Sequence, residues 1–365
     1  MRVGVLGGGQ LGRMLALAGI PLGFEFRFLE PTADPPVRGL GEHVQADYDD
    51  AAALERFADG LDVVTYEFEN VPVESARKLS EHAPVRPQPD ALECAQDRLR
   101  EKELFAKLGI PAARFERVDG ETEMARGLER LGAPAVAKTR RFGYDGHGQF
   151  VVRTTSDVTR AEKELRGAPS ILESLVPFDR ELSILAVGAR DGFHAFYPLV
   201  ENTHREGILR RSVAPPPNVS DRLQSEAQSI ASRILDELGY VGLLAVELFE
   251  VDGRLLANEM APRVHNSGHW TIEGAESSQF ENHLRAIAGL PLGATGPRGA
   301  SVMLNLIGAV PDPESVLDVP GAHLHLYGKA PRPGRKLGHV TLRGDDAAEV
   351  SAAADRLAAR LPSDG

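Results

Sequence analysis

Several features that would restrict the class of protein are absent or scarce in this 365-residue sequence. Its one cysteine, Cys94, excludes an intrachain disulfide and a cysteine-based zinc cluster. No apolar run reaches the roughly 18 residues that are needed to span a bilayer. The N-terminal residues MRVGVLGGGQ contain no signal-peptide h-region. We therefore expect a soluble, cytoplasmic protein that does not bind membranes.

Positive charge is also in deficit, because 41 Lys and Arg face 53 Asp and Glu and the net charge is −12. A chain this acidic lacks the excess of positive charge expected of a general nucleic-acid binder, although it could still contain a local basic pocket. Hydrophobic residues make up 42% and charged residues 26%, which excludes bulk disorder. The length predicts two or three domains.

The hydrophobic pattern divides the chain into three regions. Up to about residue 92, apolar strands at 3–6, 24–29 and 63–65 alternate with helical spacing, which predicts a parallel, doubly wound α/β sheet. A proline-rich linker follows, after which Asp90 is expected to cap a single helix over 91–108. Residues 93–295 read as a mixed α+β region. Residues 296–365 are mostly β and end in a helix over 347–361.

Gly7, Gly9 and Gly12 match the pattern G-x-G-x-x-G between a predicted strand and a predicted helix. In this context the motif favours a dinucleotide site, with Glu30 as the acid that binds ribose. The same glycines also fit a tight turn without a nucleotide, or a helix N-terminus that binds another phosphate. The motif alone leaves these three interpretations open.

A second candidate site begins at Lys138, at the end of a predicted strand, and continues in the glycine-rich stretch FGYDGHGQ. Glycine amides can approach phosphate oxygens closely, and a lysine is a compact point charge for phosphate. An ordinary hairpin loop is the alternative interpretation. The lysine before the loop favours phosphate binding.

Glu247 and Glu259 are predicted to face each other on a β-hairpin. Asp252-Gly253 is a strong turn signal between two apolar, alternating runs, and the two glutamates lie equally far from Gly253. Opposed carboxylates repel unless a cation lies between them, and Asn258 adds another oxygen ligand. Such oxygen ligands suit Mg²⁺ that bridges nucleotide phosphates. One inward and one solvated acid is the alternative.

Arg263, His265 and Asn266 closely follow the second of these glutamates. A fixed arginine with neighbouring donors suits a small anion, or a negative charge that develops during group transfer. The alternative is a structural loop with surface histidines.

Taken together, the motifs resemble the ATP-grasp ligases. This resemblance rests on Arg98 in DRLREK, Lys138, GYDGHGQ at 143–149, ESLV at 173–176, Glu181, Glu247 and NEMAPRVHNSGHWT at 258–271. More narrowly, GGGQLGRM at 7–14, YEFENV at 66–71 and RPGRKLGHV at 332–340 resemble the 5-(carboxyamino)imidazole ribonucleotide synthases of purine biosynthesis. His147 departs from the pattern, because family members usually have Arg or Lys there. Its charge is therefore expected to depend on pH.

The resemblance implies an ATP-grasp fold in three parts. These are an N-terminal pre-ATP-grasp domain at 1–92, an ATP-grasp domain at 93–295 with a lid at about 111–178, and a small β-rich domain at 296–365. It implies that ATP drives the carboxylation of 5-aminoimidazole ribonucleotide by bicarbonate through carboxyphosphate, with release of ADP and phosphate. Mg²⁺ is the implied cofactor and a homodimer the implied assembly.

The resemblance also implies roles for individual residues. ATP is expected to contact Arg98, Lys138, Gly143, Tyr144, Asp145, Gly146, His147, Gly148, Gln149, Glu173, Ser174, Leu175, Val176, Glu181, His204, Asn258 and Glu259. The ribonucleotide is expected on Gln10, Leu11, Glu67, Asp145, Lys329, Arg332 and Arg335, and the metal on Glu247 and Glu259. The catalytic set is expected to be Arg263, His265, Asn266, Tyr144 and Asp145.

Two alternatives remain open at this point. An ATP-grasp ligase with another acceptor, such as a formate-using ribonucleotide transformylase or a biotin-type carboxylase subunit, would share the ATP residues but lack RPGRKLGHV. A dinucleotide-binding regulator built on residues 7–12 would have no use for Glu247 and Glu259.

Overall fold

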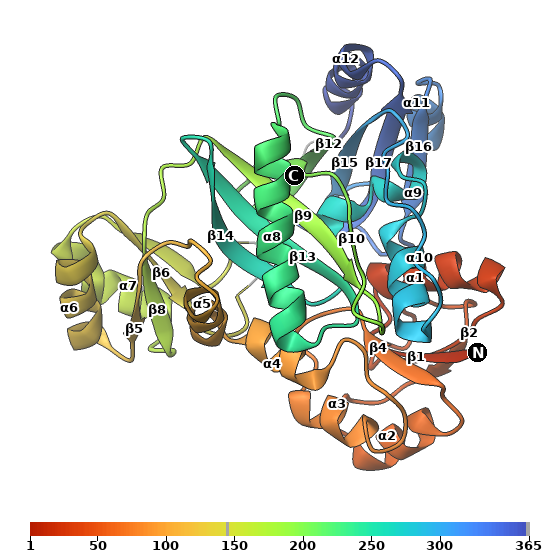
Figure 1. Cartoon of the computed structure of the whole chain (residues 1–365), viewed down its shortest axis with the longest axis horizontal. Helices are drawn as coiled ribbons and strands as arrows, with labels where there is room; N and C mark the ends of the chain where they lie inside the picture. The colour runs from red at the N-terminus through yellow and green to blue at the C-terminus, as the bar shows by residue number, and fades with distance from the viewer. Residues whose placement is uncertain (144–145, 363–365) are drawn as a thin grey trace.

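The computed structural model describes residues 1–143 and 146–362. Within these ranges the strands form three sheets, two of four strands and one of nine (Figure 1). No helix among the described residues is both long and apolar enough to cross a membrane.

The N-terminal unit contains a parallel sheet, as the strand pattern predicts. Its strands lie in the order β3-β2-β1-β4. Its helices lie on both faces, because α1 packs with Val3 and Phe26 on one side while α2 and α3 pack with Leu6 and Val64 on the other. The elements are β1 (Arg2–Leu6), α1 (Gln10–Gly19), the 3₁₀ turn η1 (Ile20–Leu22), β2 (Glu25–Leu29), β3 (Glu42–Val44), α2 (Ala51–Ala58), β4 (Val63–Tyr66) and α3 (Val73–Leu79).

The single helix expected over 91–108 is wrong, because the chain forms two helices, α4 (Pro89–Gln96) and α5 (Arg98–Lys107). Asp97 separates them in an extended conformation, and its carboxylate accepts from the Leu99 amide at 3.0 Å as the N-cap of α5. Arg140 donates to the same carboxylate from Nε at 2.9 Å. Pro89 begins α4 after Gln88, so Asp90 lies in the first turn rather than at the cap.

A small antiparallel sheet in the order β5-β8-β6-β7 forms a lobe of its own, on the left of Figure 1. We call it the β5–β8 lobe. Its separate core contains Met124, Leu128 and Leu172. The elements are β5 (Phe115–Val118), α6 (Glu121–Leu131), β6 (Ala135–Thr139), β7 (Gln149–Val152), η2 (Thr155–Asp157), α7 (Val158–Glu164) and β8 (Ser170–Ser174).

The nine-stranded sheet is antiparallel throughout and runs in the order β14-β13-β9-β11-β12-β15-β17-β16, with β10 beside β9. Its strands are β9 (Arg180–Gly188), β10 (His194–Phe196), β11 (Val200–Arg205), β12 (Ile208–Ala214), β13 (Gly242–Val251), β14 (Arg254–Ala261), β15 (Ala300–Ile307), β16 (Ala322–Leu326) and β17 (Lys336–Gly344). The accompanying helices are α8 (Asp221–Leu238), η3 (Asn266–Gly268), α9 (Thr271–Gly274), α10 (Gln279–Ala288), α11 (Pro313–Leu317) and α12 (Ala347–Ala358).

Alternation along the strands gives this sheet two different faces. Leu182 and Ile184 of β9 alternate with Ser183 and Leu185, and the first pair packs under α8. Leu185 instead joins the core that includes α10 and the N-terminal α1. The C-terminal strands extend the same sheet, because β15 is hydrogen-bonded to β12. Because Ser183 lies on the same face as Leu185, its face of the sheet is the one that meets the N-terminal unit.

Candidate active site

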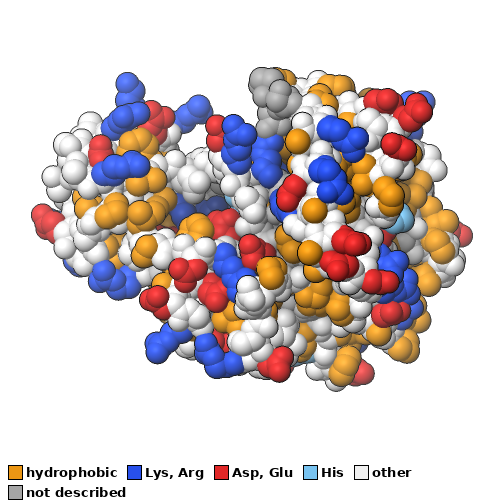
Figure 2. All heavy atoms as spheres, turned by 90° about the horizontal axis from the view of Figure 1, so that it is seen from above, with side chains coloured by type: hydrophobic (Ala, Val, Ile, Leu, Met, Phe, Trp, Pro, Cys, Tyr) orange, Lys and Arg blue, Asp and Glu red, His pale blue; other side chains and the backbone are white. Residues whose placement is uncertain are grey.

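A cavity of about 820 Å³ lies between the N-terminal unit, the β5–β8 lobe and the central sheet. Figure 2 shows the hollow beside the lobe, with both basic and acidic side chains on its walls. Most of the residues singled out by the sequence line it: Gln10, Leu11, Glu67, Arg98, Lys138, Gly143, Gly146, His147, Gln149, Glu173, Ser174, Leu175, Val176, Glu181, His204, Glu247, Asn258, Glu259, Arg263, His265 and Asn266. Tyr144 and Asp145 lie outside the described residues.

The two glutamates of the hairpin face each other across neighbouring strands, as expected, since Glu247 on β13 pairs with Glu259 on β14. The tight turn alone would not give this register, because Val251 pairs with Arg254 and Leu248 with Ala257. A bulge at Asn258 shifts the ladder by one residue and brings the second glutamate opposite the first. The pair depends on this extra residue.

Helix α5 supports the bulge from one side. Lys102 Nζ donates to the Asn258 carbonyl at 2.6 Å, and the Met260 amide donates to Glu101 Oε1 at 2.6 Å. Lys102 is 1% exposed and also lies 3.4 Å from Glu173 Oε1. The sequence analysis missed Lys102, although it lies in the DRLREK segment and four positions after Arg98, one helical turn away.

Arg98 relieves much of the repulsion between the paired carboxylates. Its Nη1 atom lies 2.7 Å from Glu259 Oε2. Burial opposes ionisation of Glu259, but the arginine outweighs burial and holds the pKa of Glu259 below its ordinary value. Burial and then the charge of Glu259 raise the pKa of Glu247 to about 7. The pair therefore still favours one more positive charge beside Glu247.

These carboxylates fit a magnesium ion shared with a nucleotide. Among the described residues, no group of three or more His, Cys, Asp or Glu side chains forms a complete metal site. Mg²⁺ commonly takes one or two carboxylates from the protein and completes its shell with phosphate oxygens and water. Glu247 and Glu259, both on the wall of the cavity, provide such a pair.

Lys138 lies where a phosphate-binding lysine is expected, on β6 of the lobe. Its Nζ atom is 2.8 Å from Glu173 Oε2. Burial disfavours the charged form of Glu173, but Lys138 and Lys102 together lower the pKa of this carboxyl. The two lysines therefore share one acid at the wall of the cavity.

The loop that begins at Gly143 turns back onto β6. Gly148 has a φ of +72°, and its carbonyl accepts from the Thr139 amide at 2.8 Å. A Cβ at Gly148 would lie 2.5 Å from Thr139 Oγ1, so this position requires glycine on both counts. Gly143, Gly146, His147 and Gln149 line the cavity, whereas Gly148 instead closes the turn.

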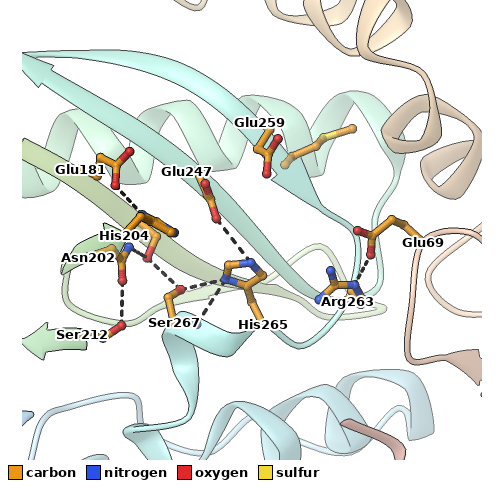
Figure 3. A network of polar contacts seen from close by, with 12 residues as sticks. Glu69, Glu181, Asn202, His204, Ser212, Glu247, Glu259, Arg263, His265 and Ser267 are labelled. Carbon is orange, nitrogen blue, oxygen red and sulfur yellow. Dashed lines mark hydrogen bonds and ion pairs between the residues drawn. The ribbon is translucent and has the colours of Figure 1, made fainter. Parts of the chain in front are cut away.

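Glu181 and His204 meet at the wall of the cavity, from the neighbouring strands β9 and β11 (Figure 3). His204 Nδ1 is hydrogen-bonded to Glu181 Oε2. Burial lowers the pKa of His204, but this hydrogen bond and the nearby Glu247 outweigh burial, so the net shift is upward. The strand pairing therefore places both predicted nucleotide residues together.

The three residues proposed for a small anion lie beside the acidic pair. His265 Nε2 is 3.4 Å from Glu247 Oε1, and Arg263 Nε pairs with Glu69 of the YEFENV segment (Figure 3). Burial lowers the pKa of His265 to about 3, so its ring is neutral. The buried amide of Asn266 has no hydrogen-bond partner among the described residues, at either its oxygen or its nitrogen. Such an amide suits a bound polar ligand.

The glycine loop after β1 is occupied by a carboxylate of the chain itself. Glu67 accepts from the amides of Gly9 and Gly12, the latter at 2.7 Å. A Cβ at Gly7 or Gly9 would lie 2.4 or 2.5 Å from Glu67 atoms, so these glycines are needed for the acid to approach. A dinucleotide phosphate would compete with Glu67 for the same donors.

Glu30 is likewise bound locally rather than free for a ribose. It accepts from the Gly8 amide at 3.0 Å, the Thr32 amide at 2.9 Å and the Tyr48 hydroxyl at 2.8 Å. Together with Glu67, it makes the dinucleotide interpretation of the glycine motif inconsistent with the geometry.

The predicted basic cluster lies at the edge of the cavity. Lys329 donates to Gln10 Oε1, which lines the cavity, whereas Arg335 donates to the Ala330 carbonyl at 3.1 Å. Arg332 is exposed. Lys336, on the same segment, lines the cavity itself and was not singled out from the sequence.

Comparisons with known proteins agree with this geometry. The chain matches the ribonucleotide synthetase preATP-grasp domain over residues 1–96 and the ATP-grasp domain over 103–280. It matches the phosphoribosylaminoimidazole carboxylase C-terminal domain over 301–353.

Several curated relatives of similar length share the name N5-carboxyaminoimidazole ribonucleotide synthase. The chain is 55% identical to the N5-carboxyaminoimidazole ribonucleotide synthase of Pseudomonas aeruginosa, over 96% of this chain and 97% of that protein. The chain belongs to this synthase family. The solved synthetase of Thermus thermophilus is 57% identical, with a TM-score of 0.95 and 99% of both chains covered.

The solved synthase of Aspergillus clavatus, in complex with ADP and 5-aminoimidazole ribonucleotide, is 33% identical. Its TM-score is 0.91, with 98% of this chain and 97% of that chain covered. Family membership confirms the fold, the ATP-dependent ligase class and the purine-biosynthetic activity expected from the sequence.

Gly9→Ala tests the contact between Glu67 and the glycine loop. The new Cβ would lie 2.5 Å from Glu67 Oε1, so the carboxylate must leave the amides it accepts from. We expect a loss of about 1–3 kcal/mol in urea denaturation, the cost of buried donors without partners. Gly296→Ala is the control, because nothing lies within 4 Å of its added Cβ. Equal effects of both substitutions would contradict the assignment.

Proposed function

We propose that this chain joins bicarbonate to the exocyclic amine of 5-aminoimidazole ribonucleotide at the expense of ATP, and that the 820 Å³ cavity is the site. The observation that carries the proposal is one cavity bounded by three different groups. These are the Lys138 and Glu173 cluster, the Glu247 and Glu259 pair, and the Glu67 loop. The complex of the Aspergillus clavatus relative with ADP and ribonucleotide supports the binding of both a nucleotide and the ribonucleotide by one protein of this family.

ATP is assigned to the lobe side of the cavity. Lys138, Arg98 and the loop at 143–149 neutralise and position the phosphates, since phosphoryl transfer needs mainly placement and charge compensation. Glu173 lies near the end of β8 and Val176 just after it, and both are assigned to adenine, while Glu181 and His204 are assigned to the ribose and nucleotide. Closure of the lobe would exclude water from an unstable intermediate.

Glu247 and Glu259 are assigned to magnesium, with Asn258 beside them. When bound, the metal neutralises phosphate charge and aligns the phosphoryl group with its acceptor. The chain's own contribution is to hold the two carboxylates opposite each other through the bulge and the contacts from α5.

Arg263, His265 and Asn266 are assigned to bicarbonate and carboxyphosphate. A bicarbonate oxygen attacks the γ-phosphorus of ATP and the bond to ADP breaks, which turns a poor electrophile into one with a phosphate leaving group. The ribonucleotide amine then bonds to the carboxyl carbon, either of carboxyphosphate itself or of carbon dioxide released from it; phosphate leaves and the amine loses a proton. The fixed guanidinium and the unpartnered Asn266 amide stabilise negative charge at this point.

The ribonucleotide is assigned to the N-terminal side, with Gln10, Leu11 and Glu67 at the base and Lys329 beside them. Arg332, Arg335 and Lys336 add positive charge for a phosphate in an otherwise acidic protein. Tyr144 and Asp145, which lie outside the described residues, are assigned to the same substrates through the family resemblance.

We also propose the division into domains at 1–92, 93–295 and 296–365 with a lid at about 111–178, and a cytoplasmic homodimer. The separate core of the β5–β8 lobe, and the separate core on one face of the N-terminal sheet, support the division. Exposed Leu17, Ile20 and Leu22 on α1 and η1, which suit an interface, support the dimer.

Glu259→Gln is expected to reduce ATP turnover about 100-fold or more, because it removes one charge from the metal and phosphate site. The measurement is steady-state ADP release, with circular dichroism to show that the fold is intact. Glu55→Gln, in an exposed position of α2, is the matched control and should retain full activity. Near-normal ADP release from folded Glu259→Gln protein would contradict the metal assignment.

Lys329→Ala is expected to raise the KM for 5-aminoimidazole ribonucleotide about 10-fold or more, while the KM for ATP stays within about two-fold. Loss of one charge-assisted hydrogen bond costs about 1.5–3 kcal/mol, which corresponds to this change. Lys78→Ala, at an exposed position of α3, controls for net charge. Equal increases in both KM values would remove Lys329 from the ribonucleotide site.

A further inference from the structure

A chain of buried hydrogen bonds runs behind His265 and ends on its ring (Figure 3). Ser212 Oγ donates to Asn202 Oδ1 at 2.8 Å, and Asn202 Nδ2 donates to Ser183 Oγ at 3.0 Å. Ser183 Oγ donates to Ser267 Oγ at 2.9 Å, and Ser267 Oγ lies 2.9 Å from His265 Nδ1. We call these four residues behind the histidine the polar chain.

The order of the strands creates the polar chain. Asn202 on β11 pairs in register with Ser212 on β12, and Ser183 on β9 pairs in register with Glu247 on β13. Ser267, which lies on η3 outside the sheet, then accepts the hydrogen bond from Ser183. The three serines are 0% exposed and Asn202 is 6% exposed, so water does not compete for these contacts.

The direction of the hydrogen bonds is fixed at the histidine. The backbone N–H of Ser267, which can only donate, lies 3.4 Å from His265 Nδ1. On the other side of the ring, Glu247 Oε1 lies 3.4 Å from Nε2. The backbone N–H therefore requires Nδ1 to accept, so in the neutral ring Nε2 carries the proton and faces Glu247. With that tautomer, every hydroxyl of the polar chain donates toward the histidine.

We propose that Ser267, oriented by Ser183, Asn202 and Ser212, is a positioning residue that holds His265 as the Nε2-protonated tautomer. In this form His265 presents an N–H to the cavity, which suits an anionic oxygen of bicarbonate or carboxyphosphate. It also leaves Nε2 without a lone pair, so His265 does not ligate the metal that Glu247 is proposed to hold. The catalytic consequence rests on the proposed function, whereas the tautomer does not.

The tautomer is tested directly by long-range ¹H–¹⁵N NMR of wild-type protein with ¹⁵N-labelled histidine, at neutral pH. The signals of His265 are identified by their loss in His265→Gln. Their ¹⁵N shifts are expected to show a protonated Nε2 and an unprotonated Nδ1. A protonated Nδ1, or an equal mixture of the two tautomers, would overturn the proposal. This measurement needs no reaction, so it stands even if the proposed function fails.

Ser267→Ala then tests what the tautomer contributes. We expect kcat/KM for bicarbonate to fall about 10-fold or more, the lower end of the range for residues that orient a site, while the KM for ATP stays unchanged. Ser301→Ala is the matched control, because Ser301 is equally buried and its hydroxyl has no hydrogen-bond partner among the described residues. Unchanged bicarbonate kinetics in Ser267→Ala, or the same loss in Ser301→Ala, would overturn the role of Ser267.

Discussion

The pairing of two half-buried carboxylates, Glu247 and Glu259, is the constraint on which the rest of the cavity depends. Two negative charges in a buried site are unfavourable unless positive charge and hydrogen-bond donors surround them. Arg98 comes from α5 to pair with one of them, and the same helix fixes the bulge through Lys102. The paired carboxylates thus determine both how the two strands are stabilised and why the site favours a cation bound to phosphate.

The same principle applies at the other end of the cavity, where a protein acid occupies the usual place of a phosphate. Glu67 uses the amides of the glycine loop, so a motif typical of dinucleotide sites instead positions an acid at the wall of the cavity. Lys329 on the C-terminal segment meets Gln10 of the first helix. This contact joins the N-terminal unit to the C-terminal region beside the cavity.

Much of this arrangement could be predicted from local sequence. The doubly wound N-terminal sheet follows from its apolar periods, and the facing glutamates follow from the Asp-Gly turn, although the turn register alone would place Asn258 opposite Glu247. The helix break at Asp97 was missed because apolar spacing does not reveal a cap shared with Arg140. The polar chain could not be predicted because nothing in the sequence distinguishes Ser183 from any other serine on a strand. Only the order of the strands brings it to Ser267.

The central claim is that one cavity couples ATP, bicarbonate and 5-aminoimidazole ribonucleotide. Its most direct test is ADP release by the purified protein with magnesium and bicarbonate, with and without the ribonucleotide. The account predicts strong stimulation by the ribonucleotide that disappears when bicarbonate is removed. ATP turnover that is indifferent to the ribonucleotide, or absent under every condition, would contradict it.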